Sequence, residues 1–440
     1  MRLSTPKRIR TLHRKLYRKA KSEPGFRFYA LYDKVYRADI LSHAYALVRS
    51  NKGAHGVDGI SFEAIEADEG KAVFVEKLQS ELRDKRYRTN AVRRVWIPKV
   101  DGSKRPLGIP TIKDRVAQQA VKLVMEPIFE ADFCETSYGF RPKRTAHDAA
   151  DAVADALRAG YTNVIDADLS KYFDTIPHAK LMAVVGERIA DGALLGLIKQ
   201  WLKAPVVDED EDGIKRSSGG RGRRHGTPQG GVISPLFSNL YLHLLDRIWE
   251  RHDLEGRHRA RLVRYADDFV VLCAGEVEPS MLVLCRVLER LELRLNENKT
   301  KVVNAWRESF DFLGFSFCIR KGRKGGRHYP HVEPSKRSIL RIKARVRQLT
   351  KRRLTPIPLP IVVENLNRVI RGWSGYFHYR NSSAAFNRVK WQVEERVRTH
   401  LRKRHKIKSR AAGYEQFPSH MLYHRCGLFK LPMAAGWTMM

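Results

Sequence analysis

The chain has 440 residues, with 83 Lys and Arg against 48 Asp and Glu, so its formal net charge is +35. Such an excess of cations excludes an ordinary neutral enzyme and is typical of a protein that binds RNA or DNA. A hydrophobic content of 43% excludes a disordered basic tail. The length suffices for about three domains of roughly 150 residues each.

Cysteine usage and hydropathy both indicate an intracellular protein. The five cysteines contain no CxxC pair, and their odd number fits neither a disulfide framework nor a zinc site. The basic N-terminus lacks the apolar core of a signal peptide, and no apolar run approaches the roughly 18 residues of a membrane span. We therefore expect a cytoplasmic protein without a membrane anchor.

The first half of the chain predicts helices interrupted by one hairpin. Helical spacing extends to about residue 81, with a Gly-rich break at 52–59. Between 93 and 110, apolar and polar residues alternate on both sides of Asp101 and Gly102, which predicts a β-hairpin. Helical spacing returns at 112–130 and 146–157, before a short strand at 163–167. This mixed order without a βαβ repeat favours an α+β fold.

The second half predicts a hairpin between helices and then a cationic helical region. Composition indicates a loop at 208–226, and the pattern then predicts a helix at 235–249 and a hairpin at 261–272. Another helix at 280–293 and a β pair around 302–318 precede a Gly- and Lys-rich linker at 321–327. Beyond 334 and at 387–410, helical apolar faces are surrounded by Lys and Arg. We favour nucleic-acid contact for these surfaces over merely solvated helix faces.

Two adjacent carboxylates, Asp267 and Asp268, lie between apolar segments in RLVRYADDFVVL. Aspartates at a hairpin tip ordinarily mark a turn. Here the flanking strands would bury the pair in a sheet, where unpaired carboxylates are costly unless cations are present. Asp168, at the end of another apolar strand, can supply a third carboxylate. Such a set can hold two Mg²⁺ ions about 4 Å apart for in-line phosphoryl transfer.

Two further aspartates compete for roles in the same segment. Asp166 lies two residues before Asp168 on the same strand face and is the alternative metal ligand. We favour Asp168 because it is nearer the strand end, and we interpret Asp166 as structural. Asp174, before Thr-Ile-Pro, has the pattern of a helix N-cap.

Three segments in order resemble the palm motifs of reverse transcriptases, in the version found in group II intron-encoded proteins. They are DADLSKYFD at 166–174, GTPQGGVISPLFSNLYLHLLD at 226–246 and YADD at 265–268. WIPKVDGSKRPLGIPTIKDRVAQQAV resembles the fingers of that family and YGFRPKRTAHDA its following block. LNENKTKVV and FDFLGFSF resemble later palm motifs, and RGWSGYFHYRNSS resembles the thumb. The resemblance extends from about residue 50 to about residue 430.

The resemblance implies a right-hand polymerase with fingers and palm and an all-helical thumb or maturase domain. We expect a basic N-terminal extension with the start of the fingers at 1–85 and the reverse transcriptase fingers and palm at 86–320. The thumb or maturase (X) domain would cover 328–410, and a short C-terminal maturase or DNA-binding remnant 411–440. Without a pair of cysteines near the end, an H-N-H endonuclease is not expected, so priming would use an existing DNA 3′ end.

The same resemblance implies roles for individual residues. Asp168, Asp267 and Asp268 would be catalytic and hold two Mg²⁺ ions, for which Mn²⁺ can substitute. Lys299 would protonate the leaving pyrophosphate. The residues expected to bind the dNTP are Lys99, Arg105, Phe173 and Gln229. The residues expected to bind nucleic acid are Arg115, Arg141, Arg371, Tyr376, Arg402 and Arg404.

Some of these roles have alternatives that the sequence leaves open. Lys99 can be an ordinary exposed hairpin charge. A bulky ring at Phe173 would exclude a 2′-hydroxyl and so select dNTPs, but the same ring can also be a core aromatic beneath the sheet. Trp373 and Phe377, within the cationic and aromatic segment 371–380, are spaced as a helix core face.

The expected function is that of an RNA-directed DNA polymerase that copies its host group II intron RNA into cDNA from dNTPs. It would also assist intron splicing and mobility as a maturase. Its partners would be the intron RNA, RNA/DNA hybrid and target DNA, in a bacterial cytoplasm and at the nucleoid when it acts on DNA. The alternatives are a free-standing reverse transcriptase used in DNA repair or phage defence, and an RNA-binding splicing cofactor without required polymerase activity.

Overall fold

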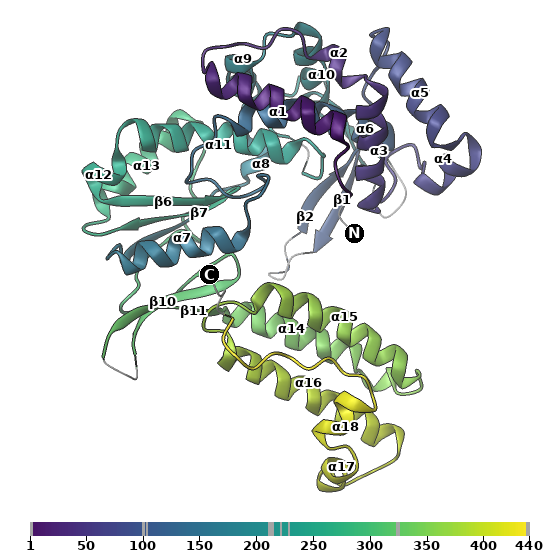
Figure 1. Ribbon diagram of the computed structural model, residues 1–440, viewed down its shortest axis with the longest axis vertical. Coiled ribbons are helices and arrows are strands. Elements are labelled where there is room, and N and C mark those ends of the chain that lie inside the picture. Colours follow the sequence, from purple (N-terminus) through teal and green to yellow (C-terminus); the bar gives the residue numbers. More distant parts are fainter. Residues whose placement is uncertain are drawn as a thin grey trace.

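The computed structural model describes residues 3–98, 102, 104–209, 215–220, 222–227, 229–322 and 326–436. Helices at the N-terminal end pack around one long helix, α6 (Ile112–Glu130), which is buried along most of its length (Figure 1). These helices are α1 (Lys7–Ser22), α2 (Tyr32–Val35), α3 (Ala38–Ser50), α4 (Phe62–Asp68) and α5 (Gly70–Arg83). In α1, Ile9, Leu12 and Leu16 are buried at helical spacing. The predicted N-terminal helices and the break at 52–59 are confirmed.

The predicted hairpin at 93–110 forms part of a larger sheet. Strand β1 (Val92–Pro98) pairs antiparallel with β2 (Lys104–Ile109), and Val95 lies opposite Leu107. A second hairpin, β4 (Val206–Glu209) and β5 (Lys215–Ser218), joins through a parallel pairing of β4 with β1. The prediction of a loop throughout 208–226 was therefore wrong in part. The β5 residues, Lys-Arg-Ser-Ser, have little strand propensity, and their pairing with β4 supplies the structure.

The central sheet has the strand order β6-β7-β3-β8 and carries the candidate carboxylates. Its strands are β3 (Asn163–Asp168), β6 (Ala260–Tyr265), β7 (Asp268–Cys273) and β8 (Lys301–Asn304). The predicted hairpin at 261–272 is the β6–β7 pair. Alternate β7 residues are buried in two different cores, because successive side chains point to opposite faces. Phe269 and Val271 belong to the core that includes α11, and Val270 and Leu272 to the core that includes α7.

Helices cover both faces of this sheet (Figure 1). Helix α7 (Ala146–Arg158) lies on one face, and α11 (Ser234–Arg251) contributes to the core on the other. Both confirm predicted helices. The remaining helices of this region are α8 (Tyr172–Thr175), α9 (His178–Arg188), α10 (Gly192–Leu202), α12 (Leu254–His258) and α13 (Glu278–Arg290).

A three-stranded sheet follows, and it crosses the predicted boundary between palm and thumb. Its strands are β9 (Phe310–Phe312), β10 (Phe315–Lys321) and β11 (His328–Pro334), with β10 in the middle. The pairing of β10 with β11 joins 328–334 to the strand before the predicted linker. The range 328–410 that was predicted as the thumb therefore begins with a strand, and its first helix begins at Lys336. Two prolines in β11 obscured this strand in the sequence.

The last part of the chain is an all-helical unit, as predicted, which lies apart from the N-terminal helices in Figure 1. Its elements are α14 (Lys336–Leu349), the 3-10 helix Arg352–Leu354, α15 (Leu359–Phe377), α16 (Ser383–Arg404), α17 (Arg410–Gln416) and α18 (Ser419–His424). Phe417, Leu422, Leu428 and Leu431 pack in the same core as α14, α15 and α16. Residues 411–436, within the range 411–440 that was predicted as a short C-terminal maturase or DNA-binding remnant, therefore pack on this helical unit.

Within the ranges that the structure describes, none of the helices has the length and apolar content that crossing a bilayer requires. All five cysteines lie in those ranges and carry free thiols.

Candidate active site

Two candidate carboxylates face each other across neighbouring strands of the central sheet. Asp168, the last residue of β3, is the antiparallel partner of Asp268, the first residue of β7. Asp267 lies in the turn between β6 and β7, next to Ala266, whose φ of +60° is a left-handed conformation. The structure thus brings together the three aspartates that the sequence singled out, from segments about one hundred residues apart.

The electrostatics of this cluster favour an added cation. Burial, followed by the neighbouring carboxylates Asp166, Asp267 and Asp168, raises the pKa of Asp268 to about 7. Although part of Asp268 is open to solvent, the protein around it withholds much of the hydration that a charged carboxylate needs. Burial also raises the pKa of Asp267, against which Arg105 acts as a nearby positive charge.

The donor set fits a hard divalent cation, because carboxylate oxygens are the ligands that Mg²⁺ and Mn²⁺ prefer. In the part of the chain that the structure describes, no three His, Cys, Asp or Glu side chains already converge closely enough to hold an ion. The aspartates would therefore adjust their side chains when a cation binds. Three carboxylates crowd here against only two nearby cations, Lys299 and Arg105, and this excess of negative charge is the observation that makes the site suitable for an added cation.

Asp166 lies beside this cluster on the same strand. The pKa of Asp166 is raised to about 6, chiefly by burial and also by Asp311 and Asp168, while the positive charge of Lys301 acts against the rise. Asp166, Lys301 and Asp311 line one pocket of about 310 Å³. Asp174 is not the N-cap that was predicted: it lies inside α8, and α9 begins after Pro177.

Lys299 and Phe173 both lie close to the end of β3. Lys299 Nζ is 3.3 Å from Asp168 Oδ2, in a partly exposed ion pair. Phe173, in α8, is half-buried, and its carbonyl oxygen accepts a hydrogen bond of 2.8 Å from the Thr227 backbone N–H. The neighbouring Tyr172 is buried at 2% exposure. Phe173 therefore lies in the short helix that follows Asp168, where this helix meets the segment that leads to Gln229.

Arg105 and Gln229 connect the hairpin β1–β2 to the central sheet. The Gly108 backbone N–H, on β2, donates to the Gln229 carbonyl oxygen at 2.5 Å. A Cβ on Gly230 would lie 2.6 Å from the Gly108 carbonyl oxygen, so this close approach requires glycine. Arg105 is exposed on β2. It lies near enough to Asp267 that its positive charge partly offsets the rise in the pKa of that carboxyl. Lys99, also predicted to bind the dNTP, lies outside the described residues.

Two arginines that were predicted to bind nucleic acid are instead buried and contact other groups inside the protein. Arg115 is 6% exposed, and its Nη2 donates to the Ala54 carbonyl oxygen at 2.7 Å. Arg141 is 7% exposed; it forms an ion pair of 2.8 Å with Glu130 and donates to the Ser137 carbonyl oxygen at 2.8 Å. Burial, together with the internal acceptors of Arg141 and of Arg115 Nη2, leaves little of either guanidinium exposed to a phosphate.

Tyr376 also differs from its predicted role in nucleic-acid binding. Its hydroxyl donates to the Leu313 carbonyl oxygen at 2.9 Å, its ring stacks on Phe315 with centroids 5.4 Å apart, and its carbonyl oxygen bonds to His147 Nε2. These contacts join α15 to the three-stranded sheet and to α7. Trp373 packs against Phe386 in the thumb core, as its spacing predicted.

The other three predicted nucleic-acid residues lie on the thumb. Arg371 is exposed, with its guanidinium 5.3 Å from the centroid of the Phe429 ring. Arg404 is exposed and donates to the Ile357 carbonyl oxygen at 2.8 Å. Arg402 is half-buried and donates to the Lys408 carbonyl oxygen at 2.6 Å.

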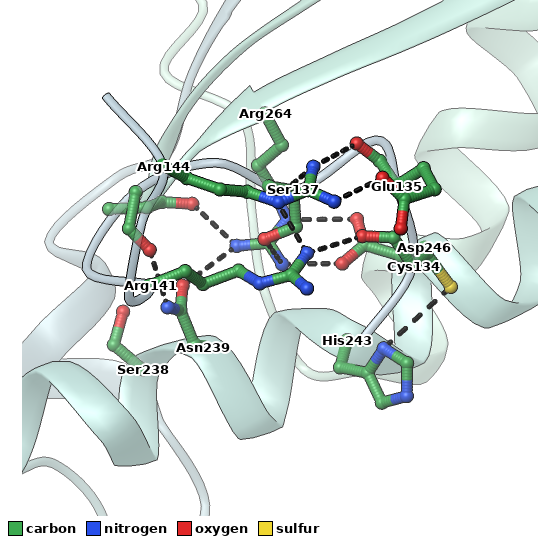
Figure 2. Close-up of polar contacts among 12 residues, drawn as sticks. Cys134, Glu135, Ser137, Arg141, Arg144, Ser238, Asn239, His243, Asp246 and Arg264 are labelled. Atoms are coloured by element: carbon green, nitrogen blue, oxygen red, sulfur yellow. Dashed lines mark hydrogen bonds and ion pairs between the residues drawn. The ribbon is translucent and has the colours of Figure 1, made fainter. Parts of the chain in front are cut away.

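The sequence did not lead us to predict a role for Arg264, which immediately precedes the Tyr265–Asp268 segment. Its guanidinium is fully buried between α11 and the segment 134–141, and it forms an ion pair with Asp246 (Figure 2). The signal was present in the sequence, because a charged residue within an apolar strand must have a buried partner. The pattern of the strand does not indicate that this partner is Asp246, which lies 18 residues earlier on a helix.

Two family models match the chain. Residues 97–317 match the model described as reverse transcriptase (RNA-dependent DNA polymerase). Residues 339–416 match the model described as the maturase-specific domain of group II introns. The first match contains the central sheet with the three aspartates, and the second covers most of the helical unit at the C-terminal end.

The chain is also similar to several curated proteins over two thirds or more of its length. Protein YkfC of Escherichia coli K12 is 37% identical over 72% of this chain and 90% of its own length. The group II intron-encoded protein LtrA of Lactococcus lactis is 29% identical over 67% of this chain and 57% of its own length. An uncharacterized 91 kDa protein in the cob intron of Schizosaccharomyces pombe is 25% identical over 80% of this chain and 51% of its own length. The chain thus spans little more than half of the latter two relatives.

Proposed function

Because the chain belongs to the reverse transcriptase family of RNA-dependent DNA polymerases and carries the maturase-specific domain of group II intron proteins, we propose that it copies intron RNA into DNA and assists splicing of that intron. The observation that carries the catalytic half is the meeting of Asp168, Asp267 and Asp268 at one end of the central sheet. Their excess of negative charge suits a site for divalent cations.

Asp168, Asp267 and Asp268 would hold Mg²⁺, with Mn²⁺ as a substitute. Two such ions, when bound, stabilise the entering and leaving oxygens of an in-line phosphoryl transfer. Lys299 lies beside Asp168, and we assign it the proton that neutralises the departing pyrophosphate. Because its ammonium pairs with Asp168, it would have to turn toward the phosphate when cations occupy the carboxylates.

The nucleotide would bind between the hairpin β1–β2 and the central sheet. Arg105 is the positive charge on β2 that reaches the carboxylate cluster, so we assign it to the triphosphate. Gln229 lies where the segment before α11 meets β2, so we assign it to the base or the template. Phe173, in the short helix after Asp168, would lie under the sugar and exclude a 2′-hydroxyl.

Primer extension tests the catalytic half. Asp267→Ala should abolish DNA synthesis on a primed RNA template in Mg²⁺, because it removes one of the cation-binding carboxylates, while affinity for the RNA/DNA hybrid changes little. Asp155→Ala is the matched control, since its exposed carboxylate on α7 pairs with Arg158. Undiminished synthesis by Asp267→Ala would reject the assignment of the site.

The maturase half is supported by the helical unit 336–436, which presents exposed arginines such as Arg371 and Arg404 around an apolar core. In a splicing assay with intron RNA, Asp267→Ala should splice normally, whereas the double charge reversal Arg371→Glu with Arg404→Glu should slow splicing. Charge removal should also flatten the salt dependence of RNA binding. Loss of splicing in Asp267→Ala would mean that the two activities are not separable.

The RNA partner can be identified by crosslinking in the native cell. Recovery of a structured RNA that flanks this reading frame would support a role in intron splicing and mobility in the bacterial cytoplasm, with target DNA at the nucleoid. A diverse RNA set without such flanks would instead support a free-standing reverse transcriptase.

A further inference from the structure

Arg264 is the most completely bonded buried cation near the carboxylate cluster. It lies on β6, one residue before Tyr265, and its side chain is 0% exposed, as is that of its partner Asp246 on α11. Arg264 Nε donates to Asp246 Oδ1 at 2.8 Å, and Nη2 donates to Asp246 Oδ2. This bidentate pair fixes the plane of the guanidinium in the interior (Figure 2).

The remaining donors of the guanidinium reach three different segments. Nη1 donates to the Ala266 carbonyl oxygen at 2.9 Å and to Asn239 Oδ1 at 3.1 Å, and Nη2 donates to Ser137 Oγ at 2.7 Å. An arginine side chain has five N–H donors in a rigid fork. All five are used here, so any movement of the fork breaks a bond in a place without water to replace it.

One of these bonds holds the turn that carries the carboxylates. Ala266 has a φ of +60°, which is unfavourable by about 1 kcal/mol or more for a residue with a Cβ. The bond from Arg264 to its carbonyl oxygen fixes this peptide, and the next residues along the chain are Asp267 and Asp268. On the other side, Gly139 lies so close that a Cβ there would be 2.4 Å from the Ala266 amide nitrogen.

The same guanidinium ties the turn to the helix that follows Gln229. Asn239 and Asp246 both lie on α11, and the Asn239 side-chain amide also donates to the Gly139 carbonyl oxygen at 2.6 Å. The turn, α11 and the segment 134–141 thus form one frame with Arg264 at its centre. If Arg264 served only to stabilise the fold, its ion pair with Asp246 would suffice. The hydrogen bond to the Ala266 carbonyl oxygen in the turn would then not be needed.

We propose that Arg264 is a positioning residue, which holds the Ala266 peptide so that Asp267 and Asp268 meet Asp168 in the arrangement that binds divalent cations. This inference rests on the proposed function, because it concerns the same carboxylates. It predicts that altering the fork of donors weakens cation binding even where the fold survives.

The test compares Arg264→Lys with Arg188→Lys. Arg188 is a buried arginine of the same kind, 4% exposed, which pairs with Asp132 and donates to backbone carbonyl oxygens of the N-terminal segment, far along the chain from the turn. Both substitutions keep the charge and remove the fork. Mn²⁺ binding is measured by electron paramagnetic resonance on the protein without nucleic acid, alongside the unfolding temperature, hybrid affinity, and kcat and KM for dNTP.

We expect Arg264→Lys to weaken Mn²⁺ binding about 10- to 100-fold, the range typical of residues that support metal ligands. Its kcat should fall while hybrid affinity stays near that of the wild type. Arg188→Lys should lose thermal stability but bind Mn²⁺ normally. Asn239→Ser, which removes one acceptor of Nη1, is the milder second variant if Arg264→Lys does not fold, and it should weaken Mn²⁺ binding in the same direction.

Folded Arg264→Lys or Asn239→Ser with wild-type Mn²⁺ affinity would overturn the inference. An equal loss of Mn²⁺ binding in Arg188→Lys would also overturn it, since general destabilisation would then explain the effect. Asp267→Ala separates this failure from that of the proposed function. If the wild type binds no more Mn²⁺ than Asp267→Ala and makes no DNA, the proposed function itself fails.

Discussion

Tyr172 and Phe173 are adjacent in the chain but lie in different environments. Tyr172 is buried in the core, where its hydroxyl donates to the Ser238 carbonyl oxygen at 2.7 Å. Phe173 packs its ring edge to face with Tyr172, with centroids 5.5 Å apart, and remains half-buried. Phe173 thus packs one side of its ring on the same core as Tyr172 and keeps the rest exposed, so both roles that the sequence offered for this ring stay predictions.

We predict that Phe173→Val admits ribonucleotides, because a smaller side chain makes room for a 2′-hydroxyl. The ratio of kcat/KM for rNTP to that for dNTP should rise about tenfold or more in primer extension. Phe74→Val is the matched control, because Phe74 is another half-buried phenylalanine that packs on the same core from α5. Unchanged sugar discrimination in Phe173→Val would contradict the steric role.

For single residues, the sequence identified the aspartates at the ends of strands but did not identify which arginines are buried. Asp267 and Asp268 were identified because burying two carboxylates between apolar strands is costly unless cations are present. Arg115 and Arg141 were misassigned because a guanidinium is ordinarily exposed. Their acceptors, at Ala54 and Glu130, lie in other segments, and no local pattern in the sequence indicates that such a pair will meet.

The turn between β6 and β7 is an element whose position depends on its contact with the segment 134–141. A Cβ on Gly139 would lie 2.4 Å from the Ala266 amide nitrogen and 2.8 Å from the Tyr265 carbonyl carbon. Both neighbours are backbone atoms, which cannot rotate away as a side chain can. Gly139→Ala must therefore displace the turn or the segment.

We predict that Gly139→Ala lowers kcat roughly 10- to 100-fold, because displacements of up to about 1 Å have effects of this size on positioned groups. Gly196→Ala is the control: it lies within α10, has no atom within 4 Å of the added Cβ, and should raise stability by about 0.5–1 kcal/mol. Steady-state primer extension and thermal unfolding measure the two effects. Full activity in Gly139→Ala would show that the turn tolerates displacement.

Periodicity predicted most elements, and it failed where pairing outweighs local preference. Helix α6 has the predicted bounds, because apolar spacing and the N-cap Thr111 mark them. Strands β5 and β11 were missed, since one is polar and the other contains two prolines. Each forms because it lies beside a strand with free backbone groups, β4 in one case and β10 in the other.

For the whole molecule, the buried His243 links stability to pH. His243 lies on α11 at 6% exposure, edge to face with Phe133 at 5.3 Å. Burial lowers the pKa of His243 from 6.5 to about 4. The folded protein therefore keeps this imidazole neutral down to about pH 4. The unfolded chain takes up a proton on the same side chain below pH 6.5, so acid favours the unfolded state over the folded one.

We predict that the lowered pKa of His243 makes the free energy of unfolding fall by about 3 kcal/mol as the pH drops from 6.5 to 4. Above pH 6.5 none of this stability is lost. Chemical denaturation at several pH values measures this dependence. His243→Gln should be less stable at pH 7 but should lose less stability on acidification. Equal losses in both proteins would assign the acid sensitivity to other groups.

The order of strands in the central sheet also determines when the site can exist during synthesis. Strand β3 is flanked by β7 and β8, both of which are made later, and Asp168 precedes its partner Asp268 by 100 residues. At roughly 5–20 residues per second, a ribosome needs about 5–20 seconds to cover that interval. Until then β3 has no neighbour in its sheet, and a nascent chain cannot begin copying the RNA that is still being translated.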